Sequence, residues 1–110
     1  MDFNIRVIQK TLSFGPTDQV KSCNVDYTGF VSVVVVDIPN FTNDVSVVLS
    51  IKNILGHEIV GHDYLKKGDD TVFHYPLAYC PVAPDFILSC TLSGQPGGAG
   101  GDINVIMYVY

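Results

Sequence analysis

The stretch DVSVVLSIK, residues 44–52, decides the fold class of this chain. Alternate positions carry apolar side chains that share one face of an extended strand, namely Val45, Val47, Leu49 and Ile51. Polar side chains occupy most of the other face, and only Val48 interrupts them. A period of two residues is typical of a strand with one face in a core and the other toward solvent. The stretch therefore predicts a half-buried β-strand.

The composition of the whole chain extends this prediction to an all-β fold. Val, Ile and Thr make up 31 of the 110 residues, whereas Ala, Glu and Lys together make up 9. The abundant residues favour strands, and the scarce ones are good helix formers. Hydrophobic residues reach 47% and charged residues only 15%, which excludes a disordered chain. A coiled coil or helical bundle is also excluded, and an α/β fold is disfavoured.

Short extended segments, separated by turn residues, follow one another along the chain. The segments that we expect cover residues 3–12, 18–27, 30–36, 44–52, 57–61, 71–75, 85–92 and 103–109. The nearly continuous apolar run at 30–36 predicts a strand buried on both faces. Turn signals at a spacing of roughly 8–12 residues are typical of β-sandwiches and jelly rolls. The sequence thus predicts one β-sandwich domain over residues 1–110, and we favour a jelly roll.

Charge and cysteine content restrict the partners and the compartment. The net charge of −5 argues against nucleic acid, because phosphate binding needs clustered Lys and Arg. The three cysteines, Cys23, Cys80 and Cys90, lack the paired spacing of zinc sites and are expected to be free thiols. The first residues lack the apolar segment of a signal peptide, and no apolar run approaches the roughly 18 residues of a membrane span. We expect synthesis in a cytosol and no membrane partner.

The segment HEIVGH, residues 57–62, is the nearest approach to a metal motif. Zinc-protease helices carry their two histidines four residues apart, whereas His57 and His62 are five apart and would lie on opposite faces of a strand. A hairpin of 57–62 with 71–75 would bring His62 close to His74. We expect exposed histidines and no metal site, with a pH-sensitive subunit contact as a milder alternative.

The glycine-rich stretch GQPGGAGG, residues 94–101, does not predict a phosphate site. A phosphate-binding loop ends in Lys followed by Ser or Thr and opens a helix, whereas this stretch lacks lysine and precedes a predicted strand. We expect it to form a long hairpin loop between the last two strands, with glycines at positive φ. No nucleophile elbow or acid/base pair is evident either. The sequence therefore predicts no enzymatic activity and no cofactor.

Three features resemble the small all-β virion proteins of tailed bacteriophages, in particular head decoration or cement proteins. They are the early turn at 13–17, the Val-rich strand that runs out through 37–44, and the glycine-rich stretch at 92–102 before a terminal strand. The resemblance implies a sandwich that trimerises and clamps neighbouring capsid subunits, with no cofactor. It also implies a location in the virion after synthesis in a host cytoplasm.

The expected mode of action is burial of apolar and tyrosine-rich surface against other subunits. The candidate interface residues are Phe3, Ile5, Val7, Tyr108 and Tyr110, and residues 1–12 are a candidate N-terminal arm or exchanged strand.

Two alternatives remain open. One is a carbohydrate- or receptor-binding module of a phage tail, which would need an exposed aromatic and carboxylate patch in loops 75–84 or 61–70. The other is a metal enzyme on a cupin-like barrel that uses the three histidines.

Overall fold

The computed structural model describes residues 5–76 and 78–110. All the regular secondary structure in this part of the chain is β-strand. The strands are β1 (Arg6–Phe14), β2 (Val20–Asn24), β3 (Gly29–Asp37), β4 (Ser46–Lys52), β5 (Glu58–Lys66), β6 (Asp70–His74), β7 (Pro81–Val82), β8 (Ile87–Leu92) and β9 (Gly101–Val109). The predicted all-β class is confirmed. None of the described residues forms a helix that could span a membrane.

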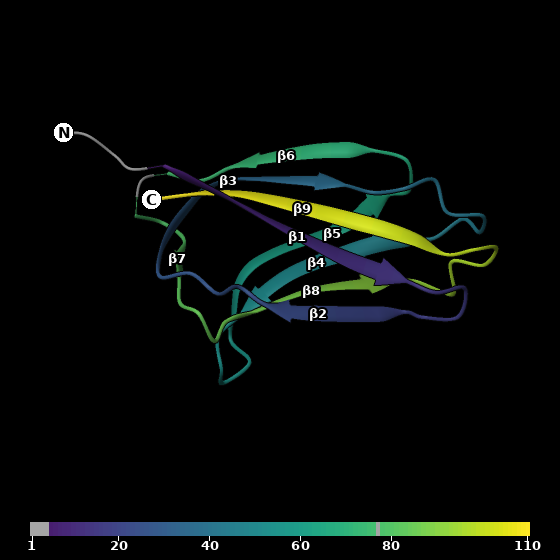
Figure 1. Ribbon diagram of the computed structural model, residues 1–110, viewed down its shortest axis with the longest axis horizontal. Coiled ribbons are helices and arrows are strands. Elements are labelled where there is room, and N and C mark those ends of the chain that lie inside the picture. Colours follow the sequence, from purple (N-terminus) through teal and green to yellow (C-terminus); the bar gives the residue numbers. More distant parts are fainter. Residues whose placement is uncertain (1–4, 77) are drawn as a thin grey trace.

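Two antiparallel sheets pack face to face (Figure 1). One has the strand order β1-β9-β3-β6, with the short β7 paired to the start of β3, and the other has the order β2-β8-β4-β5. Successive strands mostly alternate between the sheets, which is the double Greek-key connection of a jelly roll. The predicted β-sandwich of jelly-roll type is therefore confirmed.

The core lies between the two sheets, and strand alternation selects it. Val45, which precedes β4, and the alternate residues of β4 are buried as predicted. Val47, Leu49 and Ile51 are at 0% exposure. On β9 the alternate residues Ile103, Val105, Met107 and Val109 are equally inaccessible. Burial of these two central strands accounts for much of the hydrophobic driving force, at about 25 cal/mol per Å² of apolar surface.

Two predicted hairpins are wrong. Strands β5 and β6 lie in different sheets, since β5 pairs with β4 and β6 with β3. Strands β8 and β9 are separated in the same way, so the glycine-rich loop passes from one sheet to the other. The alternation of each strand marks its apolar side but does not identify the strand that pairs with it, so the sequence pattern was compatible with either arrangement. The expected positive φ is present at Gly97, Gly98 and Gly100.

The prediction that residues 30–36 are buried on both faces is also corrected. Val31, Val34 and Val36 point into the core, but Val33 and Val35 are only half-buried on the outer face of the sheet. A register shift between Val31 and Val33 separates the two halves of the strand. Strand β3 lies between β9 and β6, so both of its edges are hydrogen-bonded to neighbouring strands. Its outer face points away from the other sheet and stays open.

Residues 6–12 of the candidate arm belong to β1, an edge strand paired with β9 along its whole length. Leu12 and Phe14 of β1 are in the core, at 4% and 3% exposure. Exchange of this strand between subunits stays a prediction.

The four connections β1–β2, β3–β4, β5–β6 and β8–β9 gather at one end of the sandwich, and the start of β1 and the end of the chain lie at its other end (Figure 1).

Candidate functional site

An apolar surface covers the outer face of the β1-β9-β3-β6 sheet. Cross-strand register places side chains from all four strands side by side on it: Val7 is opposite Tyr108, which is opposite Val33, and Ile106 is opposite Val35, which is opposite Val72. We call these six residues (Val7, Val33, Val35, Val72, Ile106 and Tyr108) the outer apolar face.

This face is open to solvent at both flanks. Val7 on the edge strand β1 is 61% exposed, and Val72 on the edge strand β6 is 50% exposed. The central residues, such as Val35 and Ile106, are half-buried by their neighbours alone. Gln9 and His74 occupy the remaining edge positions of the same two rows, so the apolar side chains run diagonally from Val7 to Val72. Exposed apolar surface of this kind marks interaction sites in soluble proteins. The outer apolar face is therefore the strongest candidate for contact with other proteins.

The candidate interface residues fall partly on this face. Val7 and Tyr108 are direct cross-strand partners, and Ile5, at 60% exposure, precedes β1 on the same parity as Val7. Tyr110 is engaged within the chain: its ring lies 5.9 Å from that of Phe30, and its hydroxyl accepts a hydrogen bond from the backbone N of Ala78 at 2.7 Å. Phe3 lies outside the described residues. The interface role of these residues stays a prediction.

Sequence reasoning missed Val33, Val35 and Val72, and it did not include Ile106 among the candidate interface residues. The signal was the unbroken run VVVV at 33–36, which we interpreted as two buried faces. A strand without alternation in an antiparallel sandwich can equally mark an outer face that another subunit covers.

Polar residues border the outer apolar face toward the β3–β4 end. Thr11 donates a hydrogen bond to the side-chain oxygen of Asn104 at 2.7 Å, and Asn104 is opposite Asp37 in the sheet. Asp37 in turn is opposite Asp70. A side-chain hydrogen bond with Asp70, together with desolvation and the charge of Asp70, raises the pKa of Asp37. Like charges facing each other across two strands disfavour the doubly ionised pair.

The three histidines do not converge. His62 points between the sheets, where its ring stacks on Phe73 at a centroid distance of 3.5 Å, and its Nε2 lies 2.5 Å from the hydroxyl of Tyr75. His74 is opposite Val33, on the outer side of the other sheet, and His57 precedes β5. Among the described residues no three His, Cys, Asp or Glu side chains are placed to hold a metal ion. The predicted approach of His62 to His74 is wrong, because Phe73 and Tyr75 face His62 between the sheets, whereas His74 lies on the opposite side of β6.

Burial sets the chemistry of His62 and its partner Tyr75. Desolvation lowers the pKa of His62, and the charges of Asp63 and Glu58 offset part of this effect. Desolvation also raises the pKa of Tyr75 to about 12. Both groups are therefore neutral near pH 7, as a stacked and hydrogen-bonded contact between two sheets requires. This cluster closes the β5/β6 side of the sandwich.

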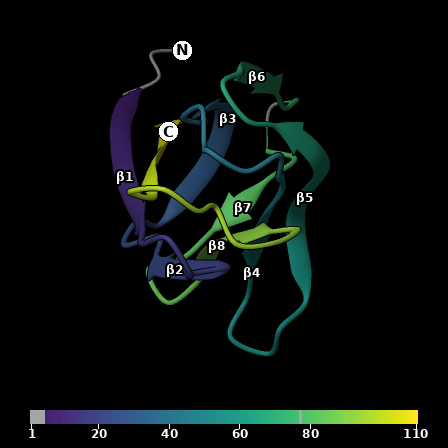
Figure 2. The same ribbon diagram turned by 90° about the vertical axis from the view of Figure 1, so that its right-hand side faces the viewer.

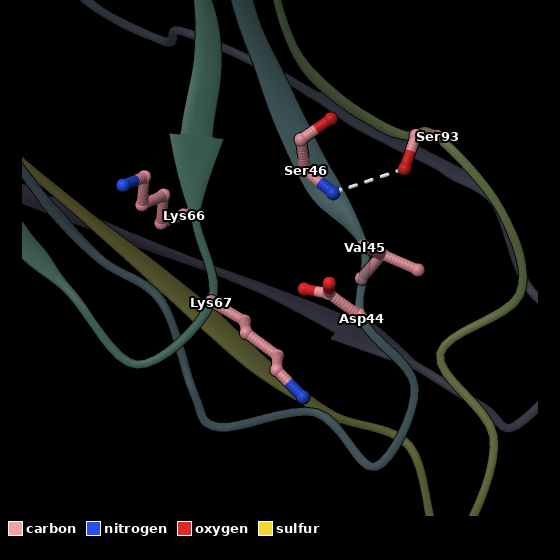
Figure 3. Close-up of a pocket in the computed structure, with 6 residues that line it drawn as sticks. All are labelled: Asp44, Val45, Ser46, Lys66, Lys67 and Ser93. Carbon is pink, nitrogen blue, oxygen red and sulfur yellow. Dashed lines mark hydrogen bonds between the residues drawn. The ribbon is translucent and has the colours of Figure 1, made fainter.

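Two adjoining pockets lie at the β3–β4 end of the other sheet. The larger, of about 560 Å³, is lined by Asp44, Val45, Ser46, Lys66, Lys67 and Ser93 (Figure 3). In it the hydroxyl of Ser93 accepts a hydrogen bond from the backbone N of Ser46 at 2.9 Å, and Lys67 donates to the carbonyl of Phe41 at 3.0 Å.

The smaller pocket, of about 300 Å³, opens onto the outer face of β4, β5 and β8. It is lined by Ser46, Val48, Asp63, Tyr64, Thr91, Leu92 and Ser93, and we call it the outer hollow. Tyr64 is 82% exposed and has a φ of 58°, and a register shift between β4 and β5 falls beside it. Such bulges re-aim a side chain, here the tyrosine ring toward solvent.

The three cysteines are free, as expected. Cys80 and Cys90 are buried, and burial raises their pKa values to about 11 and about 12. Cys23 is half-buried, and its pKa is raised mainly by desolvation. Thiols in this state are poor nucleophiles and metal ligands.

Comparison with solved structures finds the same architecture in chains of viral particles. A chain of the cyanophage Pam1 capsid superposes with a TM-score of 0.59 at 13% identity, covering 97% of this chain and 86% of the other. The Tobacco streak virus coat protein gives a TM-score of 0.52 at 9% identity, covering 98% of this chain and 88% of the other. A chain of infectious bursal disease virus, Gx strain, gives 0.51 at 14% identity, and this chain spans 32% of its length.

No family model matches the sequence, and no curated protein matches it. At these identities the structural likeness establishes the fold, so the chain has a jelly roll of the kind seen in these viral capsid and coat chains.

Proposed function

We propose that this chain is a non-enzymatic structural protein of a virion that binds other protein subunits through its outer apolar face. In the more specific form of the proposal, it is a decoration or cement protein on the head of a tailed bacteriophage and acts as a homotrimer. The observation that carries the proposal is an apolar sheet face, open at Val7 and Val72, on a fold shared with viral capsid chains.

The physical basis is that a partner covering the outer apolar face removes apolar surface from water, which lowers the free energy of the complex. Full burial of one Val, Ile or Tyr side chain stabilises a contact by roughly 1.5–3 kcal/mol before association costs. Val7, Val72 and Tyr108 lie at the flanks and centre of one flat surface, so a single partner can cover all three. The net charge of −5 favours a protein partner over nucleic acid.

Incorporation into particles tests the proposal. The double variant Val7→Lys/Val72→Lys keeps the fold, because both side chains are at least half exposed, but it places two charges on the face. Each variant is supplied to infected cells whose virus lacks this gene, and purified particles are analysed for the chain by mass spectrometry. We expect the wild-type chain in stoichiometric amounts and at least a tenfold loss for the double variant, equivalent to about 1.4 kcal/mol.

Val20→Lys is the matched control, since Val20 is 55% exposed on the edge strand β2 of the other sheet. It should enter particles like the wild type. Particles that lack the wild-type chain, or that incorporate the double variant normally, would overturn the proposal.

A carbohydrate- or receptor-binding tail module is the alternative, and one observation favours it. Tyr64, adjacent to Asp63 and to the hydroxyls of Thr91 and Ser93 in the outer hollow, combines an exposed ring with polar groups. An aromatic platform flanked by a carboxylate can bind a sugar ring. A glycan-binding screen compares the wild type with Tyr64→Asn, which tolerates positive φ; a blank screen removes this alternative.

A further inference from the structure

Strand β6 ends its sheet, and its free side is open to a further strand. Figure 1 and Figure 2 both show it at the margin of the sandwich, and no described strand pairs with it on the side away from β3. Its pairing with β3 runs from Asp70 to His74 without a register shift. The edge of a sheet presents backbone N–H and C=O groups to any strand that comes alongside. A regular edge of this kind is a template for pairing with another chain.

The other three edge strands, β1, β2 and β5, carry features that hinder such pairing. On β1, Lys10 lies in the inward row and forms an ion pair with Asp26 at 2.8 Å, and on β2 the inward row contains Lys21. Two register shifts interrupt the pairing of β5 with β4. Inward-pointing charges and bulges keep the edges of natural sheets from pairing with other chains. Strand β6 has neither, since its inward residues are Thr71 and Phe73.

The hydrogen bonds between β6 and β3 determine which backbone groups face the free side. The backbone N of Tyr75 donates to the carbonyl of Ser32, directly opposite it in register, at 2.8 Å. In an antiparallel pair, residues bonded to the neighbouring strand alternate with residues whose N–H and C=O groups are turned away. The residues of β6 turned toward the free side are therefore Asp70, Val72 and His74.

These three residues are self-complementary in an antiparallel pair of two copies of β6. When Val72 is opposite Val72 of a second copy, Asp70 is opposite His74 of that copy, and His74 is opposite its Asp70. All of these residues turn their backbone groups toward the other strand, so each pair exchanges two hydrogen bonds. On the outer face a carboxylate meets an imidazole at both ends, and two valines meet in the middle. A shift by two residues in either direction would place Val72 opposite a polar side chain.

The neighbours of β6 in its own sheet favour the same arrangement. Asp70 faces Asp37 on β3, so its cross-strand neighbour within the chain is another carboxyl group. An imidazole on the free side of Asp70 offers a hydrogen-bond donor that offsets this repulsion. Val72 faces Val35 and is 50% exposed. Pairing therefore covers the open flank of Val72 and joins the outer apolar faces of the two copies.

We propose that β6 of one copy pairs antiparallel with β6 of a second copy, about a two-fold axis beside Val72. The contact is isologous, because the same residues of the two copies meet, and it makes one continuous sheet of the two β1-β9-β3-β6 sheets. This inference goes beyond the proposed function and does not depend on it, since other virion subunits are proposed to bind the face of the sheet and not its edge. Where the proposed trimer also forms, the contact links two trimers.

Disulfide cross-linking of the purified chain tests the contact. Directly opposite, hydrogen-bonded residues of antiparallel strands have Cα atoms about 5.5 Å apart, which suits a disulfide. After mild oxidation, Val72→Cys should therefore give a covalent dimer at twice 12.0 kDa on a non-reducing gel. The matched control is Val20→Cys, because Val20 is 55% exposed on the edge strand β2, and the wild type gives the background of the natural cysteines. A dimer yield for Val72→Cys no higher than that of the control would overturn the proposal.

Two further cysteine variants test the register. Asp70→Cys and His74→Cys should each stay at the chain mass when oxidised alone, because neither residue is opposite its own copy. A mixture of the two should give a cross-linked dimer, because residue 70 of one copy is opposite residue 74 of the other. Cross-linking of either variant with itself, or none in the mixture, would refute the register about Val72.

A proline at position 72 tests the backbone hydrogen bonds. The N–H of Val72 points to the free side, so Val72→Pro removes no hydrogen bond to β3. Val20→Pro is the matched control, because Leu92 donates to the carbonyl of Gln19 at 2.7 Å and the N–H of the next residue, Val20, therefore points away from β8. By size-exclusion chromatography with light scattering, Val72→Pro should have half the mass of the wild type, and Val20→Pro should keep the wild-type mass.

The expected masses are 12.0 kDa for Val72→Pro and twice this value for the wild type, or three copies against six where the trimer also forms. A monomeric wild type, or a folded Val72→Pro with the wild-type mass, would overturn the proposal. If Val72→Pro fails to fold, the cross-linking decides. A Val72→Cys dimer in a chain that never enters particles would leave the β6 contact standing and refute the virion role.

Discussion

Two glycine-to-alanine changes separate backbone strain from steric clash in this fold. Gly56 in the turn between β4 and β5 and Gly100 in the loop before β9 have similar positive φ values of 84° and 73°. Each donates its backbone N–H within a turn, Gly56 to Asn53 and Gly100 to Gly97. They differ in their surroundings: a Cβ at Gly56 would meet nothing within 4 Å, whereas a Cβ at Gly100 would collide with the carbonyl of Phe14.

The expected magnitudes follow from this difference. Left-handed backbone costs an L-residue about 1–2 kcal/mol, and alanine recovers roughly 0.4–1 kcal/mol by restricting the unfolded chain. Gly56→Ala should therefore lower the free energy of unfolding by about 1 kcal/mol. Gly100→Ala adds a clash with backbone atoms that no rotamer can relieve, and overpacking of this kind costs about 1–3 kcal/mol. Its total loss should be about 2–4 kcal/mol.

Urea unfolding of the purified variants measures both values, with thermal midpoints falling by about 4 °C per kcal/mol for a domain of this size. The difference between the variants isolates the clash, because the φ cost is common to both. Equal losses, or a larger loss at Gly56, would refute the assigned role of Gly100 in letting the glycine-rich loop pack on the end of β1.

Three further measurements follow from the titratable groups. Because the pKa of His62 is lowered in the folded protein, its contribution to stability is full above the unfolded value of about 6.5 and is lost as pH falls below it. His62→Phe should flatten the decline of the urea midpoint between about pH 7 and pH 5, and an unchanged decline would count against this account. The pKa of Asp37 is raised in the folded protein, so its contribution to stability is full at acid pH and is lost as pH rises through the folded value. Asp37→Asn should therefore raise the free energy of unfolding at neutral pH by about 0.2–0.5 kcal/mol. It should give no gain near pH 3, where the carboxyl is protonated. A destabilised variant at neutral pH would argue against repulsion from Asp70. Cys80 and Cys90 should react with a thiol reagent near pH 8 only after unfolding, and rapid labelling of the native protein would contradict their burial.

Periodicity predicted which side chains of β4 and β9 enter the core. The alternation in β4 and in β9 was visible in the sequence, and the structure buries Leu49 and Met107 completely. It also placed Tyr108 on the opposite side from Met107, where it meets Val7 across the sheet. These predictions succeed because the face of a strand depends on local parity alone.

Strand pairing was decided by tertiary structure. The sequence suggested hairpins for β5 with β6 and for β8 with β9, whereas the two sheets separate both pairs. Parity marks the apolar side of a strand without identifying the sheet that covers it. The stack of His62 on Phe73 across the sheets follows only from this non-local pairing.

The candidate surfaces show the same division. The sequence by itself determined an all-β sandwich and the core-facing positions of β4 and β9, because these depend on composition and on a period of two residues. Only the tertiary structure decided that Val7, Val33 and Val72 share one open face, and that β4, β5 and β8 together line the outer hollow. Each surface joins residues far apart in the chain, and their proximity is set by cross-strand register, which no local pattern records.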